Sequence, residues 1–275
     1  AIGRILRVTG RVRRGLGTIR QDLNVSVPNG ALIEIKGVQE LELLATVVEY
    51  EVQRQLNLLK IKEELRNRSV DEKALSDEFV DVSEVFKKTG CKVIKKALED
   101  SKVVFSVKLP LFAGLVKTEL MPGIRLGTEM ADRARFWGKV GGIFHTDELP
   151  AYGISVQEVD SLKQAMKASD EDAVIFVADA HENATDALKA VIERAQEALR
   201  CVPGGTRTAK PDGTTRYMRP RPGAARMYPE TDVPPIQITE GRLSLLKAHL
   251  PELPEQRMTR LTKTLGLNEK LARQI

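Results

Sequence analysis

The sequence predicts an α+β protein in which an antiparallel sheet carries an inserted α+β module and is followed by a helical segment. Three patterns lead to this fold class. A β-hairpin is expected at residues 15–36, helical and strand patterns alternate within 76–202, and helical periodicity dominates 239–275. The alternation of helical and strand patterns begins only after a long amphipathic segment. The middle of the chain is therefore expected to form a separate α+β module.

The hairpin follows from side-chain alternation and turn chemistry. In its first strand Leu23 and Val25 alternate with Asp22 and Asn24, so apolar and polar side chains point to opposite faces. Residues 27–30, Val-Pro-Asn-Gly, fit a type I turn. A three-residue loop would pair Val27 with Ala31. This register sets Asp22 opposite Lys36 and Asn24 opposite Glu34.

One face of the predicted hairpin is polar, and we call it the polar hairpin face. It comprises Arg20, Asp22, Asn24, Ser26, Glu34 and Lys36. A solvated sheet face has a similar composition, and Asp22 could simply pair with Lys36 across the ladder. However, carboxylates, cations and neutral hydrogen-bonding groups at adjacent positions can together hold a divalent cation and a phosphate. Asp22 and Glu34 are therefore the candidate metal ligands.

A helix is expected from residue 38 to residue 67, covering the apolar face of the sheet. Its predicted buried stripe repeats at steps of three and four and comprises Leu41, Leu44, Val48, Val52, Gln55, Leu59 and Glu63. The residues expected off this stripe are Glu49, Glu51, Arg54 and Lys62. Residues 68–71 mark a break after the helix.

The inserted module, residues 76–202, is expected to contain helices and strands around a sheet. The helices are predicted at 82–99, 156–166 and 185–199, with Ser155 as the N-cap of the second. A strand, turn and second strand are predicted at 103–116, and a buried strand at 173–178. The glycines at 138 and 153 indicate a loop-rich centre.

Beyond the module the chain is expected to return to strands and then to helices. Two short strands are predicted at 207–210 and 215–219, joined by a Pro-Asp-Gly turn. Helices follow at 242–249 and 255–265, and a third begins at residue 268. Gly266 is a plausible C-cap of the second.

Charge favours a polyanionic partner. The net charge is +5 and the pI about 9.1. Arginine and lysine concentrate at 4–20 and 207–226, which could form one nucleic-acid surface or two solvated basic loops. No run of 18 or more apolar residues is present, so no transmembrane helix and no membrane partner are expected. The two cysteines are interpreted as reduced thiols of a cytoplasmic protein.

Four motifs, in order, resemble the amidotransferase family that converts Glu-tRNA(Gln) to Gln-tRNA(Gln), whose bacterial form is the B subunit and whose archaeal form is the E subunit. GTIRQDLNVSV and EIKGVQELELL at 17–44 resemble its cradle domain. FWGKVGGIFHTDELPAYGI at 136–154 resembles an insertion domain that the archaeal form shares with bacterial-type aspartyl-tRNA synthetases. YPETDVPP at 228–235 and LPELPEQR at 250–257 resemble the end of the cradle and the start of a helical domain.

The resemblance implies a domain division of the chain. Residues 1–75 would be part of the cradle domain, 76–202 the aspartyl-tRNA-synthetase-like insertion, 203–236 the return of the cradle, and 237–275 the start of the helical domain. Since the chain begins with Ala1 and stops inside a helical pattern, it is expected to be an internal fragment. Further metal ligands would then lie outside it.

The resemblance also implies chemistry. ATP would phosphorylate the glutamate carried by tRNA(Gln), and ammonia from an amidase- or asparaginase-like partner, the D subunit, would displace the phosphate. Asp22 and Glu34 would bind Mg²⁺, and Lys36 would act with them. Arg20, Asn24 and Ser26 would contact ATP or the tRNA 3′ end. The tRNA backbone would lie on Arg13, Arg14, Arg219 and Arg221. The alternatives are a non-catalytic tRNA-binding scaffold and a module of an aspartyl-tRNA synthetase.

Overall fold

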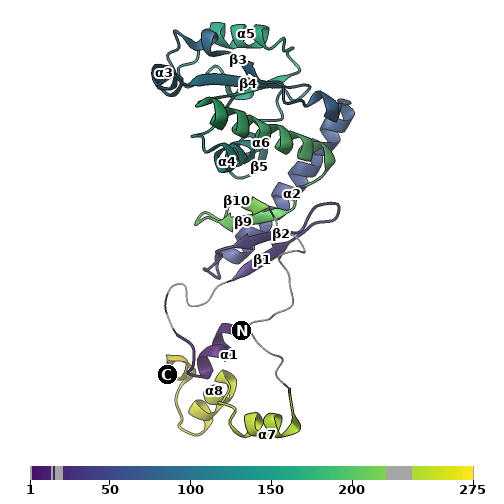
Figure 1. Cartoon of the computed structure of the whole chain (residues 1–275). Coiled ribbons are helices and arrows are strands. Elements are labelled where there is room, and N and C mark those ends of the chain that lie inside the picture. Colours follow the sequence, from purple (N-terminus) through teal and green to yellow (C-terminus); the bar gives the residue numbers. More distant parts are fainter. Residues whose placement is uncertain (1, 14, 16–20, 221–236, 275) are drawn as a thin grey trace. The chain divides into compact units, whose positions relative to one another are not determined.

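The computed structural model describes residues 2–13, 15, 21–220 and 237–274 (Figure 1). The chain forms two compact units. The larger comprises residues 21–222, and the smaller combines residues 1–20 with 223–275. The larger unit contains the predicted hairpin from residue 21 onward and the inserted module, so it carries most of the candidate site residues.

The first sheet of the larger unit is assembled from both ends of the unit. Its strands are β1 (Asp22–Val25), β2 (Ile33–Lys36), β9 (Gly205–Ala209) and β10 (Thr215–Pro220), in that order across the sheet. The β1–β2 and β9–β10 pairs are antiparallel, whereas β2 and β9 are parallel. In the sequence, the whole inserted module therefore lies between two neighbouring strands of one sheet.

The register of the hairpin confirms the prediction. Asp22 is opposite Lys36 and Asn24 is opposite Glu34. The turn closes through the Gly30 amide, which donates to the Val27 carbonyl at 2.9 Å. The predicted pairing of Val27 with Ala31 is wrong, because the strands end at Val25 and Ile33. Instead, the Gln55 side chain accepts from the Ala31 amide at 3.1 Å and donates to the Val25 carbonyl at 3.3 Å.

Helix α2 (Leu43–Asn67) connects the first sheet to the module (Figure 1). Val47 packs on the buried face of the sheet. Further along, Leu58, Ile61 and Leu65 belong to the core of the module. The helix begins at residue 43, later than expected.

The predicted stripe of this helix is confirmed in part: Gln55 is fully buried, and Leu44, Val52 and Leu59 are half-buried and pack on the cores, whereas Leu41 lies 71% exposed. The residues that are buried include Glu51 and Arg54. Helical periodicity places Glu51 and Arg54 off the buried stripe, because it treats charged residues as exposed. It cannot show that a buried partner compensates their charges.

The module is built on a second sheet with helices on both faces. Its strands, in spatial order, are β3 (Val80–Asp81), β4 (Val103–Leu109), β8 (Ala173–Asp179) and β7 (Phe144–His145), and all its pairs are antiparallel. Figure 1 shows α4 (Leu126–Gly138) and α6 (His181–Arg200) on one side of this sheet and α3 (Lys92–Glu99) with α5 (Val156–Ala165) on the other. A two-stranded ribbon, β5 (Glu119–Met121) and β6 (Ile124–Arg125), and short 3₁₀ turns at Ser83–Phe86 and Thr146–Glu148 complete it, and a further 3₁₀ turn at Glu72–Ala74 precedes it.

Two predictions inside the module need correction. The helix expected at 82–99 is a 3₁₀ turn followed by α3, and only the first of the two strands expected at 103–116 forms. Helix α4 occupies a stretch for which no element is predicted from the sequence. By contrast, α5 begins after Ser155 as expected, and the Ser155 side chain accepts from the Glu158 amide.

The described part of the smaller unit is helical. It contains α1 (Ile2–Val8), α7 (Glu240–Ala248), α8 (Pro254–Lys263) and α9 (Glu269–Gln274). Gly266, predicted as the C-cap of α8, does have a left-handed conformation at φ +63°, but the helix ends earlier, with Thr264 as its C-cap. Among the helices that the structure describes, none has the length and apolar character needed to cross a bilayer.

Candidate functional site

Two polar rows cross one face of the first sheet. The strand registers align Asp22, Lys36 and Thr208 in one row and Asn24, Glu34 and Thr206 in the next. Partners in a ladder point to the same face. The opposite face carries Val25, Ile33 and Ile35, which are buried against α2. The alternation that predicted the hairpin therefore also separates its chemical face from its packing face.

Lys36 holds the two candidate metal ligands together. Its Nζ atom donates to Asp22 Oδ2 at 2.8 Å and to Glu34 Oε1 at 2.9 Å. The hydrogen bond from Lys36 lowers the pKa of Glu34, and a bond from Thr206 adds to this effect. Hydrogen bonds to Asp22 and Glu34 likewise raise the pKa of Lys36. The Glu34 carboxylate is thus held ionised beside the Lys36 cation, which Asp22 also contacts.

Thr206 fixes the second oxygen of Glu34. Its hydroxyl donates to Glu34 Oε2 at 2.9 Å, and Thr206 itself is completely buried. Thr206 belongs to β9, so the strand that follows the module completes the surroundings of Glu34. Sequence reasoning missed this residue, because nothing local to residue 206 indicates which strand lies beside it.

The carboxylates fit a divalent cation to a limited extent. Oxygens of Asp22 and Glu34 converge on the Lys36 ammonium, which stands where a bound cation would be shared. Mg²⁺ commonly takes one or two protein carboxylates and fills its other positions with water and phosphate oxygens. No group of three or more His, Cys, Asp or Glu side chains with metal-binding geometry occurs within the described ranges. The two acids can therefore form only part of a coordination shell.

The other predicted site residues are distributed as follows. Asn24 and Ser26 are exposed, and Ser26 lies just past the end of β1. Arg13 is exposed in the smaller unit. Arg14, Arg20 and Arg221 lie outside the described residues. Arg219 pairs with Thr206 in the β9–β10 ladder and so extends the second polar row. Its Nε atom is buried with no hydrogen-bond partner in the part of the chain that the structure describes.

The second basic stretch, 207–226, is not a uniformly solvated loop. Arg207 is 3% exposed and lies within a cluster of buried charges. Arg216 is half-exposed, but its Nε donates to Asp132 Oδ1 at 2.9 Å. The expectation that every cation of this stretch faces solvent or tRNA is therefore wrong for Arg207, since its charge is needed inside the protein.

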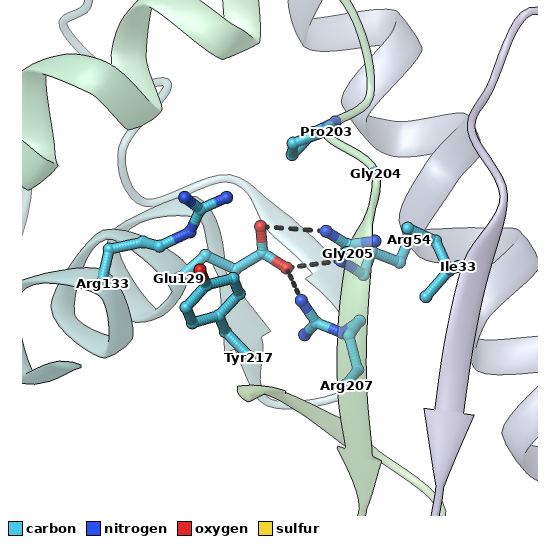
Figure 2. A pocket seen from close by; sticks show the side chains of 9 residues that line it. All are labelled: Ile33, Arg54, Glu129, Arg133, Pro203, Gly204, Gly205, Arg207 and Tyr217. Atoms are coloured by element: carbon cyan, nitrogen blue, oxygen red, sulfur yellow. Dashed lines mark hydrogen bonds and ion pairs between the residues drawn. The ribbon is translucent and has the colours of Figure 1, made fainter. Parts of the chain in front are cut away.

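The buried charge cluster comprises Glu51, Arg54, Glu129, Arg194 and Arg207, none more than 3% exposed. Glu129 of α4 is at its centre (Figure 2). Its carboxylate is bound by Arg54 of α2, accepts from Arg194 Nη2 at 2.9 Å, and lies 3.0 Å from Arg207 Nη1. Elements of the module and of the first sheet thus meet at one carboxylate.

The surrounding cations keep Glu129 ionised. Burial alone would raise its pKa, but the charges of Arg54, Arg207 and Arg194 hold it well below its ordinary value. Arg207 is affected in the opposite way, because burial and the like charge of Arg54 lower its pKa to about 10. Glu129, Arg54 and Arg207 are therefore charged at neutral pH. The cluster's only local signal in the sequence is the Glu51/Arg54 pair at helical spacing.

Comparison with known proteins supports one assignment. The family model described as "GAD domain" matches residues 94–188, within the inserted module. Three curated relatives are described as the E subunit of glutamyl-tRNA(Gln) amidotransferase. The protein from Pyrococcus furiosus is 53% identical over 274 residues, that from Methanocaldococcus jannaschii 54% over 275, and that from Methanococcus maripaludis 52% over 274. Each alignment covers 100% of this chain but only 43% of the relative's length.

Proposed function

We propose a role for the polar hairpin face from the family to which this chain belongs. That family is the archaeal glutamyl-tRNA(Gln) amidotransferase E subunit, and the chain spans 43% of the length of those proteins. The face takes part in the ATP-dependent phosphorylation of glutamate esterified to tRNA(Gln). The observation that carries the proposal is the convergence of Asp22 and Glu34 on one cation position.

Asp22 and Glu34 would hold Mg²⁺ together with ligands from outside this chain. When bound there, Mg²⁺ supplies charge neutralisation for the phosphoryl group in transfer. Lys36, already poised between the two acids, would then be free to donate to a phosphoryl oxygen. Thr206 would keep the Glu34 carboxylate oriented through its 2.9 Å bond.

The reaction is proposed in two steps. The γ-phosphate of ATP transfers to the γ-carboxylate of the tRNA-bound glutamate, and ADP leaves. Ammonia then attacks the resulting acyl phosphate, an amide forms, and inorganic phosphate leaves. The ammonia would come from an amidase- or asparaginase-like partner, the D subunit. Asn24 and Ser26, exposed beside the acids, would contact ATP or the tRNA 3′ end, together with Arg20.

The cations at the edge of the sheet and in the smaller unit would bind the tRNA backbone. Arg219 extends the row that contains Glu34, on the strand at one edge of the first sheet. Arg13 is exposed. Arg14 and Arg221 are proposed to act with them. Such contacts recognise phosphates, so they position the tRNA without reading its sequence.

The test uses the full-length protein together with its ammonia-supplying partner. Asp22→Asn and Glu34→Gln preserve side-chain size but remove the negative charge. We expect transfer of labelled γ-phosphate to Glu-tRNA to fall at least about 100-fold, whereas tRNA affinity stays within a few fold, because the acids bind the phosphoryl side of the reaction. Glu49→Gln, at an exposed position on α2, is the matched control.

A non-catalytic tRNA-binding scaffold predicts a different result. In that case both acid variants phosphorylate Glu-tRNA at the wild-type rate, and the 2.8 Å Asp22–Lys36 pair is merely a cross-strand ion pair. An aspartyl-tRNA synthetase module explains residues 94–188 alone. It leaves unexplained the similarity of the remaining chain to the amidotransferase relatives.

A further inference from the structure

Two large aromatic side chains lie exposed at the end of α4, beside the edge strand β10 of the first sheet. Phe136 is 46% exposed and Trp137 is 49% exposed, and their rings meet edge to face with 5.0 Å between centroids. We propose that this pair, the aromatic platform, stacks against unpaired nucleotides at the 3′ end of the tRNA. The proposal rests on the proposed function, which brings that 3′ end to the polar hairpin face.

The platform lies where a polar row of the sheet ends. Asp22, Lys36 and Thr208 form the first row, and the β9–β10 register adds Arg216, which pairs with Thr208. Partners in a ladder point to the same face, so Arg216 is on the face of the candidate metal ligands. From β1 to β10 the row crosses three strand spacings, or about 14 Å. A few nucleotides of single-stranded RNA can span this distance.

Arg216 connects the polar row to α4. Its Nε donates to Asp132 Oδ1 at 2.9 Å, and Arg135 Nη1 donates to the same oxygen at 3.1 Å. The next residue, Tyr217, points to the opposite face of the sheet and meets Phe136 edge to face, with 5.7 Å between centroids. These contacts hold the last turns of α4 against β10. The exposed rings therefore lie next to the end of the row.

The rings are supported before any ligand arrives. The Arg133 guanidinium lies over the Tyr217 ring, 4.1 Å from its centroid, and Figure 2 shows both side chains. Tyr217 in turn contacts Phe136, and Phe136 contacts Trp137. A ring that is already fixed loses little conformational entropy when a ligand stacks on it. Half-exposed and supported from below, the pair has the properties of a preorganised binding surface.

The chemistry of the platform suits a nucleotide. Every base has a π-face, so exposed aromatic side chains bind unpaired bases of any sequence. Cations for the adjoining phosphates lie beside the rings. Arg135 and Arg216 share the Asp132 carboxylate, and Lys139 is exposed just past the end of α4. An unpaired nucleotide supplies both of the required groups, a flat base and a phosphate.

The charges around the platform are nearly balanced. Arg133 pairs with Glu197 at 3.0 Å. Burial raises the pKa of Tyr217, and the charge of Arg133 opposes this, whereas the nearby Glu197 and Glu193 carboxylates add to it. The groups near the rings are thus Arg133, Arg135, Lys139 and Arg216 against Asp132, Glu193 and Glu197. Stacking rather than phosphate attraction must therefore supply most of the affinity.

The test measures binding of the full-length protein to uncharged tRNA(Gln), either complete or shortened by its unpaired 3′ nucleotides. Trp137→Leu removes the ring but keeps an apolar side chain. It should weaken binding of the complete tRNA roughly 5–100-fold, as expected for the loss of one stacked base, without changing the salt dependence. Binding of the shortened tRNA should stay unchanged. Trp137→Phe keeps a ring and should retain most of the affinity, and Tyr152→Leu, at an exposed position of the same module, is the control.

Fluorescence reports the contact directly, because Trp137 is the only tryptophan among the 275 residues. A short RNA with the tRNA 3′-terminal sequence should quench the emission of the chain. The same sequence held in a duplex should quench it much less, since its bases are stacked on one another. Quenching by the single strand together with the binding result supports the platform.

Other outcomes overturn the proposal. An equal loss of affinity for both tRNAs, or no loss in Trp137→Leu, would show that the ring does not contact the 3′ end. Quenching by ATP and not by RNA would assign the ring to the adenine of ATP. Weaker association with the ammonia-supplying partner at unchanged tRNA affinity would identify a protein-docking surface. Neither readout involves phosphorylation, so a wild-type phosphorylation rate in Asp22→Asn would count against the proposed function alone.

Discussion

Glu129 and Arg207 form an ion pair with 3.0 Å between Oε1 and Nη1, although each side chain is only 4% exposed. One residue belongs to α4 and the other to β9. The pair therefore joins the inserted module to the strand that follows it.

We expect Glu129→Gln to lower the free energy of unfolding by about 3–5 kcal/mol, because it leaves buried arginines without their shared counter-charge. Denaturant unfolding followed by circular dichroism measures this. Glu171→Gln, at an exposed position, serves as the control and should change stability by less than about 0.5 kcal/mol. A decrease below about 1 kcal/mol for Glu129→Gln would show that the cluster does not hold the unit together.

Lys36→Met should raise the pKa of Glu34 towards its ordinary value, because the hydrogen bond from Lys36 is the largest cause of its lowering. NMR titration of carboxyl-labelled glutamates measures this directly. A lowered folded-state pKa means that Glu34 contributes stability above its unfolded-state value and loses it as pH falls through the folded-state value. In Lys36→Met this acid-dependent loss should shrink. Lys163→Met, which breaks the distant pair with Asp170, should leave the Glu34 titration unchanged.

Thr206→Val should also raise the pKa of Glu34, but by less than Lys36→Met, since the Thr206 bond is the smaller of the two lowering hydrogen bonds. Removal of this bond should cost about 0.5–1.5 kcal/mol of stability. The same titration and a denaturant curve report both effects. Thr208→Val, one pleat further along β9, is the control. Equal titration curves for the two valine variants would mean that Thr206 does not orient the carboxylate.

Changing Arg219 and Arg221 to Gln should weaken tRNA binding and flatten its dependence on salt. The log–log slope should decrease by about 0.7–0.9 for each phosphate that is no longer neutralised. A salt titration of tRNA binding to the full-length protein measures this. Arg13→Gln with Arg14→Gln should behave alike, and Lys163→Gln is the control. Unchanged slopes in both double variants would show that these arginines are merely solvated.

Residues 43–202 should unfold as one cooperative unit, whereas 76–202 alone should melt at a lower temperature. Leu58, Ile61 and Leu65 of α2 are part of the module core, and each buried side chain contributes about 1.5–3 kcal/mol. Calorimetry of the two fragments tests this. If their melting temperatures are the same, the module does not depend on the helix that precedes it.

The hairpin could be predicted because its determinants are local. Alternation along the strand and the Pro-Asn-Gly turn fix the register without reference to the rest of the chain, and Asp22 is indeed opposite Lys36. The partner strand β9 could not be predicted in the same way. Which strand lies beside β2 depends on how the module folds between them.

The burial of Glu51 and Arg54 could not be read from helical periodicity. Charged residues mark the exposed side of a helix unless a partner compensates them. Here the partner of Arg54 is Glu129, 75 residues further along the chain. Helix α4 was missed for a related reason, since Gly138 looked like a loop residue. In the structure a side chain at 138 would meet Ala187 of α6 at 2.6 Å, so the glycine permits close helix packing.

The parallel pairing of β2 with β9 has a consequence for synthesis. The Glu34 side chain and the Thr206 hydroxyl that fixes it are separated by 172 positions. At about 5–20 residues per second, the ribosome adds Thr206 roughly 10–30 s after Glu34. Until then β2 is an unprotected sheet edge with free backbone donors and acceptors. The nascent chain must therefore complete a whole module before the edge that carries the candidate chemistry is closed.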